Sequence, residues 1–164
     1  MSRAPLHTAR SHELPTVQQL SIFIEERVGQ LMRLTRIFDG TDVHILGLSV
    51  AYEADVAIVR LIVDRPEEAT LLLGQKGIAV TQNEVAVAQV PSGPTGLQMV
   101  FSALLRGEVS ILYVYPLLPQ IPSPTDPVPR PALVLRVDEL ATAVSTLISQ
   151  GITVLSQEDL ASAF

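Results

Sequence analysis

Two segments of the chain combine glycine and polar residues, the second with proline as well, just before a helical pattern begins. They are EERVGQL (residues 25–31) and PSGPTGLQMV (residues 91–100). The first backbone N–H groups of a helix have no partner inside the helix, and with the helix dipole behind them they suit a carboxylate. Gly29 would let a ligand approach the main chain closely. The alternative is a short strand-to-helix connection that needs glycine only to turn, and these residues alone leave both interpretations open.

The side chains that could catalyse a reaction do not form a coherent set. The chain has no cysteine, and two of its three histidines, His7 and His12, lie near the N-terminus. His44 begins an apolar run and is interpreted as a half-buried or surface residue. Glu25 and Glu26 could form an acid/base pair, but acids at such a turn are more often solvated or helix-dipole partners. With neither a Walker-type phosphate loop nor a GxGxxG motif, the sequence predicts no catalytic residue, metal or cofactor.

Composition narrows the class of protein. Hydrophobic residues make up 48% of the 164 residues and charged residues 17%, which is enough apolar material for a core. The formal net charge is -6 and Lys76 is the single lysine, so the chain lacks the basic run of a nucleic-acid binder. No apolar run reaches the roughly 18 residues of a membrane span, and the N-terminal segment lacks the apolar stretch of a secretory signal. We therefore expect a cytoplasmic protein that binds neither nucleic acid nor a membrane.

Hydrophobic periodicity predicts the elements that position the two turns. Residues 1–15 show no period and are predicted to be a flexible tail. Alternating or β-branched runs predict strands over 16–26, 43–52, 55–64, 78–82, 84–91, 109–118, 132–137 and 152–156. Helical spacing predicts helices over 28–40, 64–77, 94–107 and 138–151. The side chains expected on the buried faces of the first, third and fourth helices are Val28, Leu31, Leu34 and Phe38; Leu97, Val100, Phe101, Leu104 and Leu105; and Leu140, Val144, Leu147 and Ile148.

The order strand, helix, strand, strand, helix, strand occurs twice. Leu31 and Leu97 are separated by 66 positions, whereas Gly77 and Gly151 are separated by 74. The difference of eight falls within residues 116–131, which hold seven of the twelve prolines and are predicted to be a proline-rich hairpin loop inserted in the second copy. The sequence thus predicts an α+β fold of two ferredoxin-like βαββαβ units in tandem, each an antiparallel sheet with its helices on one face. The first unit is assigned to residues 16–83 and the second to residues 84–164.

On these residues the chain resembles tandem ACT-domain proteins of the small bacterial type. Both turn segments resemble the Pro-Gly-x-Leu pattern that opens the first helix of an ACT domain. The stretches LSVAYEADVAIVRLIVDRPEEA (48–69), SILYVY (110–115) and SQGITVLSQEDL (149–160) are similar to pieces of the two domains. The resemblance runs from about residue 16 to residue 160 and depends on the order, spacing and duplication of these pieces.

The resemblance implies a non-enzymatic regulatory protein that binds a free amino acid at an interface between ACT units, and that forms a homodimer or acts on an enzyme of amino-acid metabolism. The positions that match the family's ligand-binding turns and strand wall are Glu26, Arg27, Val28, Gly29, Gln30, Leu31, Leu46, Gly47, Leu48, Ser92, Gly93, Pro94 and Thr95. The chain departs from the family pattern at Val28 (a proline there), at Thr95 (a glycine there) and at Tyr52, Val56 and Ala57 (an Asp and a Phe-Gly pair there).

We therefore predict that the first unit binds an amino acid, while binding to the second unit stays open. The alternative function is a ligand-free interaction module that dimerises or docks on an amino-acid biosynthetic enzyme.

Overall fold

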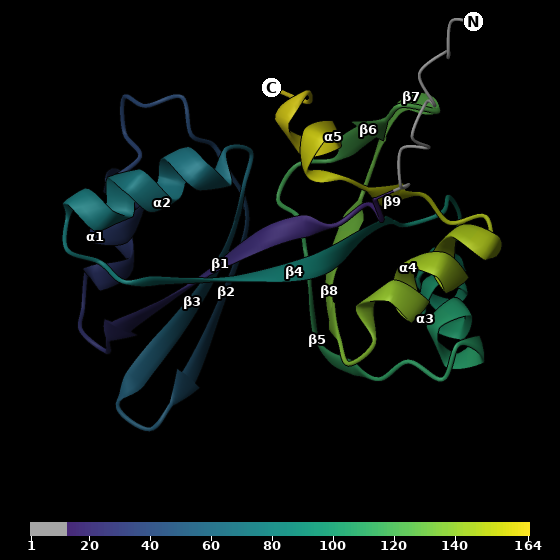
Figure 1. The fold of residues 1–164 in the computed structure, drawn as a ribbon, viewed down its shortest axis with the longest axis horizontal. Coiled ribbons are helices and arrows are strands. Elements are labelled where there is room, and N and C mark those ends of the chain that lie inside the picture. Colours follow the sequence, from purple (N-terminus) through teal and green to yellow (C-terminus); the bar gives the residue numbers. More distant parts are fainter. Residues whose placement is uncertain (1–12) are drawn as a thin grey trace, which may run out of the picture.

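The computed structural model describes residues 13–164, and it shows two α+β units side by side (Figure 1). Most of the predicted tail, with His7 and His12, lies outside the described residues. The first unit contains β1 (Val17–Glu25), α1 (Gln30–Arg36), β2 (Ile45–Glu53), β3 (Val56–Val63) and α2 (Pro66–Gln75). The second contains α3 (Gly96–Arg106), β5 (Ile111–Pro116), β8 (Ala132–Val137), α4 (Leu140–Ser149) and β9 (Val154–Leu155). The α+β fold of tandem ferredoxin-like units is thus confirmed.

One strand, β4 (Val80–Gln89), belongs to both units. Its first half pairs with β1, from Val17 opposite Val85 to Ile22 opposite Val80, and its second half pairs with β8 and β9. The prediction of separate strands over 78–82 and 84–91 is therefore wrong, because the polar residues between them stay in the ladder instead of turning. The seven strands named so far form one antiparallel sheet in the order β2-β3-β1-β4-β8-β5, with β9 beside β4.

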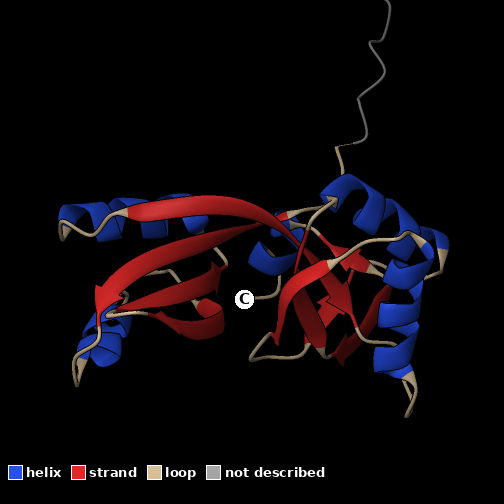
Figure 2. Cartoon of the chain, turned by 90° about the horizontal axis from the view of Figure 1, so that it is seen from below, coloured by secondary structure: helices blue, strands red, loops and turns tan. Residues whose placement is uncertain are grey.

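Helices α1 to α4 cover one face of this sheet, two over each unit (Figure 2). Leu34 of α1, Phe38 just after it, and Ala69 and Leu73 of α2 pack on β1 and β3. Val100, Leu104, Val144 and Leu147 of the second pair pack on β4 and β8. The predicted buried faces are too wide, since Val28, Leu31, Leu97, Phe101, Leu105 and Ile148 are exposed. Each helix packs mainly on the sheet, with α3 and α4 also in contact with each other, so a narrow apolar stripe suffices, and Val28 precedes α1 altogether.

The opposite face of the sheet curves onto itself and encloses a core shared by the units. The edge strands approach each other where the Leu118 amide donates to the Leu46 carbonyl at 2.8 Å. Within this core the fully buried Gln19 amide donates to the Tyr113 hydroxyl and its oxygen accepts from the Tyr115 hydroxyl, both at 2.7 Å. Burial, helped by the neighbouring Tyr113, raises the pKa of Tyr115 well above its usual range. We call this hydrogen-bonded trio the central triad.

Two further elements lie outside the repeated pattern. The proline-rich insertion is a hairpin of β6 (Ile121–Ser123) and β7 (Asp126–Arg130). The second element is helix α5 (Gln157–Ala161), which follows β9. A capping box between Ser156 and Asp159 starts α5, which the sequence analysis did not predict. None of the helices in the part of the chain that the structure describes is both long and apolar enough to cross a membrane.

Candidate functional site

A hollow of about 350 Å³ lies between the β1–α1 turn and the β2–β3 hairpin. We call it the first corner. The residues that line it are Ile24, Glu25, Glu26, Arg27, Val28, Gln30, Leu31, Val50, Tyr52 and Ala57. The antiparallel register explains why distant segments meet here, because Glu25 at the end of β1 pairs with Val56 at the start of β3, which in turn pairs with Glu53 at the end of β2.

The turn that forms one wall of the first corner depends on Gly29. Its φ is 85°, in the left-handed region that costs other residues about 1–2 kcal/mol. A Cβ placed on Gly29 would meet no heavy atom within 4 Å, so the backbone conformation and not the space selects glycine. The turn closes with hydrogen bonds from the Gln30 amide to the Arg27 carbonyl at 3.2 Å and from the Arg33 amide to the Gly29 carbonyl at 3.0 Å. Among the described residues, the amides of Val28 and Gly29 have no acceptor.

The first corner offers both charge signs beside an apolar wall. Arg27 Nε lies 2.9 Å from Glu25 Oε2, and the two side chains are 70% and 68% exposed. Glu26 adds a second carboxylate, while Ile24, Val50 and the nearly fully buried Ala57 supply apolar surface. Such a set can hold a small molecule that carries a carboxylate, an ammonium group and an apolar side chain.

The predicted binding residues of the first unit divide between two places. Glu26, Arg27, Val28, Gln30 and Leu31 line the first corner, and Gly29 shapes its turn. The predicted strand wall lies elsewhere: Leu46 is buried in the shared core, Gly47 faces Leu117 and Ile62, and Leu48 packs on the helix side of the sheet.

Leu46, Gly47 and Leu48 lie near the start of β2 and do not line the first corner. Because β3 reverses the chain direction, the end of β2 reaches the turn, and its Val50 and Tyr52 form the wall with Ala57 of β3. The alternation of Leu48, Val50 and Tyr52 on one face of the strand was the signal that could have located them.

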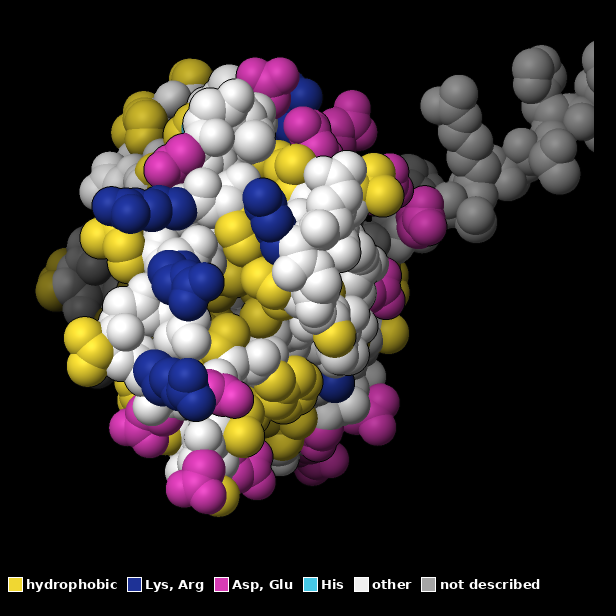
Figure 3. All heavy atoms as spheres, turned by 90° about the vertical axis from the view of Figure 1, so that its left-hand side faces the viewer, with side chains coloured by type: hydrophobic (Ala, Val, Ile, Leu, Met, Phe, Trp, Pro, Cys, Tyr) yellow, Lys and Arg dark blue, Asp and Glu magenta, His cyan; other side chains and the backbone are white. Residues whose placement is uncertain are grey.

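A second hollow of about 430 Å³ adjoins the first corner on the helix side. It shares Ile24, Glu25 and Gln30 with the first corner and adds the cationic side chains of Arg33 and Lys76. Figure 3 faces this end of the molecule, where basic side chains and exposed hydrophobic ones lie close together. The surroundings of the first corner are thus more basic than the chain's net charge of -6 suggests.

The corresponding turn of the second unit is built differently. Its left-handed residue is Gly93, with φ 97°, while Thr95 has φ -102° and stands directly before α3. Helix α3 begins at Gly96, so the prediction that Pro94 lies in its first turn is wrong. A hollow of about 330 Å³, which we call the second corner, is lined by Gln89, Val90, Pro91, Ser92, Asp126, Arg130, Gly151, Ile152 and Thr153. Of the four residues predicted to bind ligand in this unit, only Ser92 lines it.

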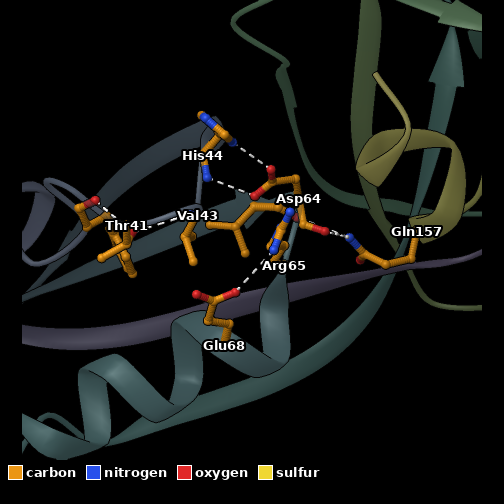
Figure 4. A network of polar contacts seen from close by, with 9 residues as sticks. Thr41, Val43, His44, Asp64, Arg65, Glu68 and Gln157 are labelled. Atoms are coloured by element: carbon orange, nitrogen blue, oxygen red, sulfur yellow. Dashed lines mark hydrogen bonds and ion pairs between the residues drawn. The ribbon is translucent and has the colours of Figure 1, made fainter. Parts of the chain in front are cut away.

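His44 is oriented by a carboxylate and not by a metal-type cluster (Figure 4). Its Nδ1 lies 2.7 Å from Asp64 Oδ2, and its backbone amide donates to Asp64 Oδ1 at 2.7 Å. Ser110 and Asp138, the equivalent residues of the second unit, repeat the backbone contact at 2.9 Å. The shared contact therefore ties each strand entry to the strand end beside it. Gln157 of α5 donates to the Val63 carbonyl at 3.0 Å, which joins the C-terminal helix to the same place.

Comparison with known proteins gives concordant results. A family model described as an ACT domain pair matches residues 15–163. The chain is similar to the solved structure of protein BT0572 from Bacteroides thetaiotaomicron, with 26% identity and a TM-score of 0.75 over 89% of this chain and 96% of that one. Comparison with the curated proteins gives no match.

Two more distant structures share the fold. The ligand-free regulatory subunit of aspartate kinase from Thermus thermophilus has 14% identity and a TM-score of 0.54 over 84% of this chain and 94% of that one. The regulatory subunit of aspartate kinase from Thermus flavus has 10% identity and a TM-score of 0.51 over 85% of this chain and 94% of that one. The resemblance seen in the sequence is confirmed, and the chain belongs to the ACT domain pair family.

Proposed function

We propose that the first corner binds a free amino acid and that the chain acts as a regulatory sensor without a catalytic activity of its own. The observation that carries the proposal is the combination, in one hollow, of Arg27, two carboxylates and an apolar wall. The regulatory role of the two aspartate kinase subunits supports the proposal by analogy of fold alone.

The geometry suggests how the ligand would lie. Its carboxylate would meet the Arg27 guanidinium and the amides of Val28 and Gly29, and its ammonium group would meet Glu25 or Glu26. The side chain would then lie on Ile24, Val50 and Ala57. The existing Arg27–Glu25 pair is exposed, and such pairs contribute only about 0–1 kcal/mol, so a ligand can take either partner at little cost.

A second copy of the chain would complete the site. Val28 is fully exposed, and Met32 and Tyr52, near or at the rim of the first corner, are 58% and 66% exposed. These apolar side chains would be covered if two copies met over the first corner as a homodimer. Ligand binding would then shift the balance between two arrangements of the copies, in proportion to its differential affinity for them.

The same exposed side chains support a second candidate function. In that case the surface around the first corner would dock an enzyme of amino-acid metabolism, with no small ligand between them. A partner whose capture is indifferent to added amino acids would favour this interaction module over the sensor.

Calorimetric titration with each of the twenty amino acids tests the sensor directly. We expect one or a few with apolar side chains to bind, and at a ligand concentration 100 times Kd the native state should gain about 2.7 kcal/mol. Arg27→Gln should weaken binding at least ten-fold, because it removes the charged partner of the carboxylate. Arg106→Gln is the matched control, since Arg106 is an exposed arginine of the second unit that bonds only Gln150 among the described residues. Heat changes absent across the whole panel would exclude the sensor.

A further inference from the structure

The proline-rich hairpin is anchored firmly beside the second corner. Ile121 of β6 is fully buried in the shared core, and Ser123 is 8% exposed. The buried Gln89 side chain donates to the Ile121 carbonyl at 2.6 Å, and the Val90 amide donates to the Pro131 carbonyl at 2.8 Å. The hairpin is therefore held at both of its ends against β4, the strand that leads into the turn of the second unit.

This anchoring brings one guanidinium into the second corner. Arg130 donates from Nε and Nη2 to Asp126 Oδ2, at 2.9 Å and 2.7 Å, and from Nη1 to the Ser92 hydroxyl. Asp126 Oδ1 accepts from the Val128 amide at 3.0 Å. The Val128 amide and then Arg130 hold the pKa of Asp126 below its usual range, so the carboxylate stays charged opposite the arginine.

Two residues beside this guanidinium correspond to residues of the first corner. With the 66-residue offset, Pro91 and Ser92 stand where the first unit has Glu25 and Glu26. The first unit has a short β2–β3 turn at Ala54 and Asp55, and its corner is open. The second unit has the eight-residue insertion, which supplies Asp126, and the side chains of Arg130 and Asp126 are only 28% and 32% exposed.

We infer that Asp126 and Ser92, on the wall of the second corner, form a guanidinium-binding site that Arg130 occupies in cis. A carboxylate oxygen of Asp126 and the hydroxyl oxygen of Ser92 accept from different nitrogens of the planar guanidinium group, an arrangement that an ammonium group cannot match.

Chemical rescue tests the inference without any amino-acid ligand. Arg130→Ala should vacate the guanidinium site, and ethylguanidinium at millimolar concentration should then raise the melting temperature of the variant saturably, by more than it raises that of the wild type. Ethylammonium should give no such difference, because it lacks the planar fork. Arg106→Ala is the control, since it removes an exposed arginine from the same unit. Equal responses of Arg130→Ala and Arg106→Ala to ethylguanidinium would overturn the inference.

Two further measurements keep the test decisive. If Arg130→Ala does not fold, Arg130→Lys keeps the positive charge and loses the fork, and the same rescue is expected at higher concentration; Arg130→Lys melting like the wild type with no rescue would overturn the inference. Calorimetric titration of the wild type with each of the twenty amino acids separates the inference from the sensor. An amino acid that binds while Arg130→Ala shows no rescue would overturn the inference and leave the sensor standing, whereas heat changes absent for every amino acid, together with rescue of Arg130→Ala, would exclude the sensor alone.

Discussion

The two units of the chain share a strand, a core and a repeated pattern, yet the hollows beside their strand-to-helix turns are lined by different residues. In the first unit the turn after β1 borders a hollow with Arg27 and two glutamates at its edge. In the second, the insertion brings Arg130, which is paired with Asp126, against Ser92. The difference teaches that a repeat can keep its fold while one inserted hairpin changes the side chains that line a hollow.

One aligned position, Gln30 in the first unit and Gly96 in the second, differs most in the space that it leaves for a side chain. A Cβ on Gly96 would lie 2.1 Å from the Pro91 carbonyl oxygen, whereas Gln30 carries a full side chain along its hollow. We expect Gly96→Ala to lower the free energy of unfolding by about 3 kcal/mol, at the upper end for overpacking, because the clash is with backbone. Urea unfolding measures the loss. Gly29→Ala is the comparison and should cost about 1–2 kcal/mol, for its left-handed φ alone. Equal losses of unfolding free energy for the two variants would contradict the interpretation that lack of space selects glycine at position 96 and backbone conformation selects it at position 29.

The central triad provides a test that the core between the corners is common to both units. Tyr115→Phe leaves the buried Gln19 oxygen without its donor, so the free energy of unfolding should fall by about 1–3 kcal/mol. The pH dependence of the free energy of unfolding gives a second test. Because the pKa of Tyr115 is higher in the folded than in the unfolded chain, its contribution is complete below about pH 10 and decreases as pH rises above that value.

Unfolding measured from pH 9 to pH 11 should therefore show stability falling more steeply in the wild type than in Tyr115→Phe. Tyr52→Phe, which removes the hydroxyl of an exposed tyrosine of the first corner, is the control variant. Parallel curves for wild type and Tyr115→Phe would contradict a protonated, buried Tyr115.

How far the sequence predicts these features depends on the range of the interaction. Helices α1 to α4, most of the strands and the duplication follow from local periodicity, and the turn around Gly29 follows from a short motif. The continuity of β4 does not, because Asn83 and Glu84 are polar and only their pairing with β1 keeps the strand extended. The wall of the first corner also needs the register of β2 on β3, which places Tyr52 at the turn and Leu46 in the shared core.

The contact between Arg130 and Ser92 was beyond prediction for the same reason. The two residues lie 38 positions apart, and the proline-rich segment was interpreted only as an inserted hairpin. Ile121 of this hairpin packs in the shared core, and that packing decides which side chain the hairpin presents to the distant turn. Such long-range packing cannot be predicted from composition.

The carboxylates of the first corner allow a test of which residue contacts the ammonium group of the proposed ligand. Glu26→Gln keeps the size of the side chain and removes the charge that would hold an ammonium group. We expect it to weaken amino-acid binding about ten-fold, equivalent to about 1.4 kcal/mol, with little change in melting temperature. Calorimetric titration measures the change, and Glu108→Gln, at an exposed glutamate after α3, is the control. Affinity equal to that of the wild type would assign the ammonium contact to Glu25 instead.

The smallest expected effect concerns the acceptor that Arg130 finds in the second corner. Ser92→Ala removes one neutral acceptor and leaves both bonds to Asp126, so the free energy of unfolding should fall by about 1 kcal/mol. Asp126→Asn should cost more, because it weakens two charge-assisted bonds together. Urea unfolding of both variants and of Ser102→Ala, a neutral change on exposed α3 surface, gives the ranking. If Ser92→Ala equalled Asp126→Asn, the hydroxyl would matter as much as the carboxylate. The two bonds by which Asp126 orients Arg130 within the hairpin would then contribute no more to stability than the single contact that joins Arg130 to Ser92.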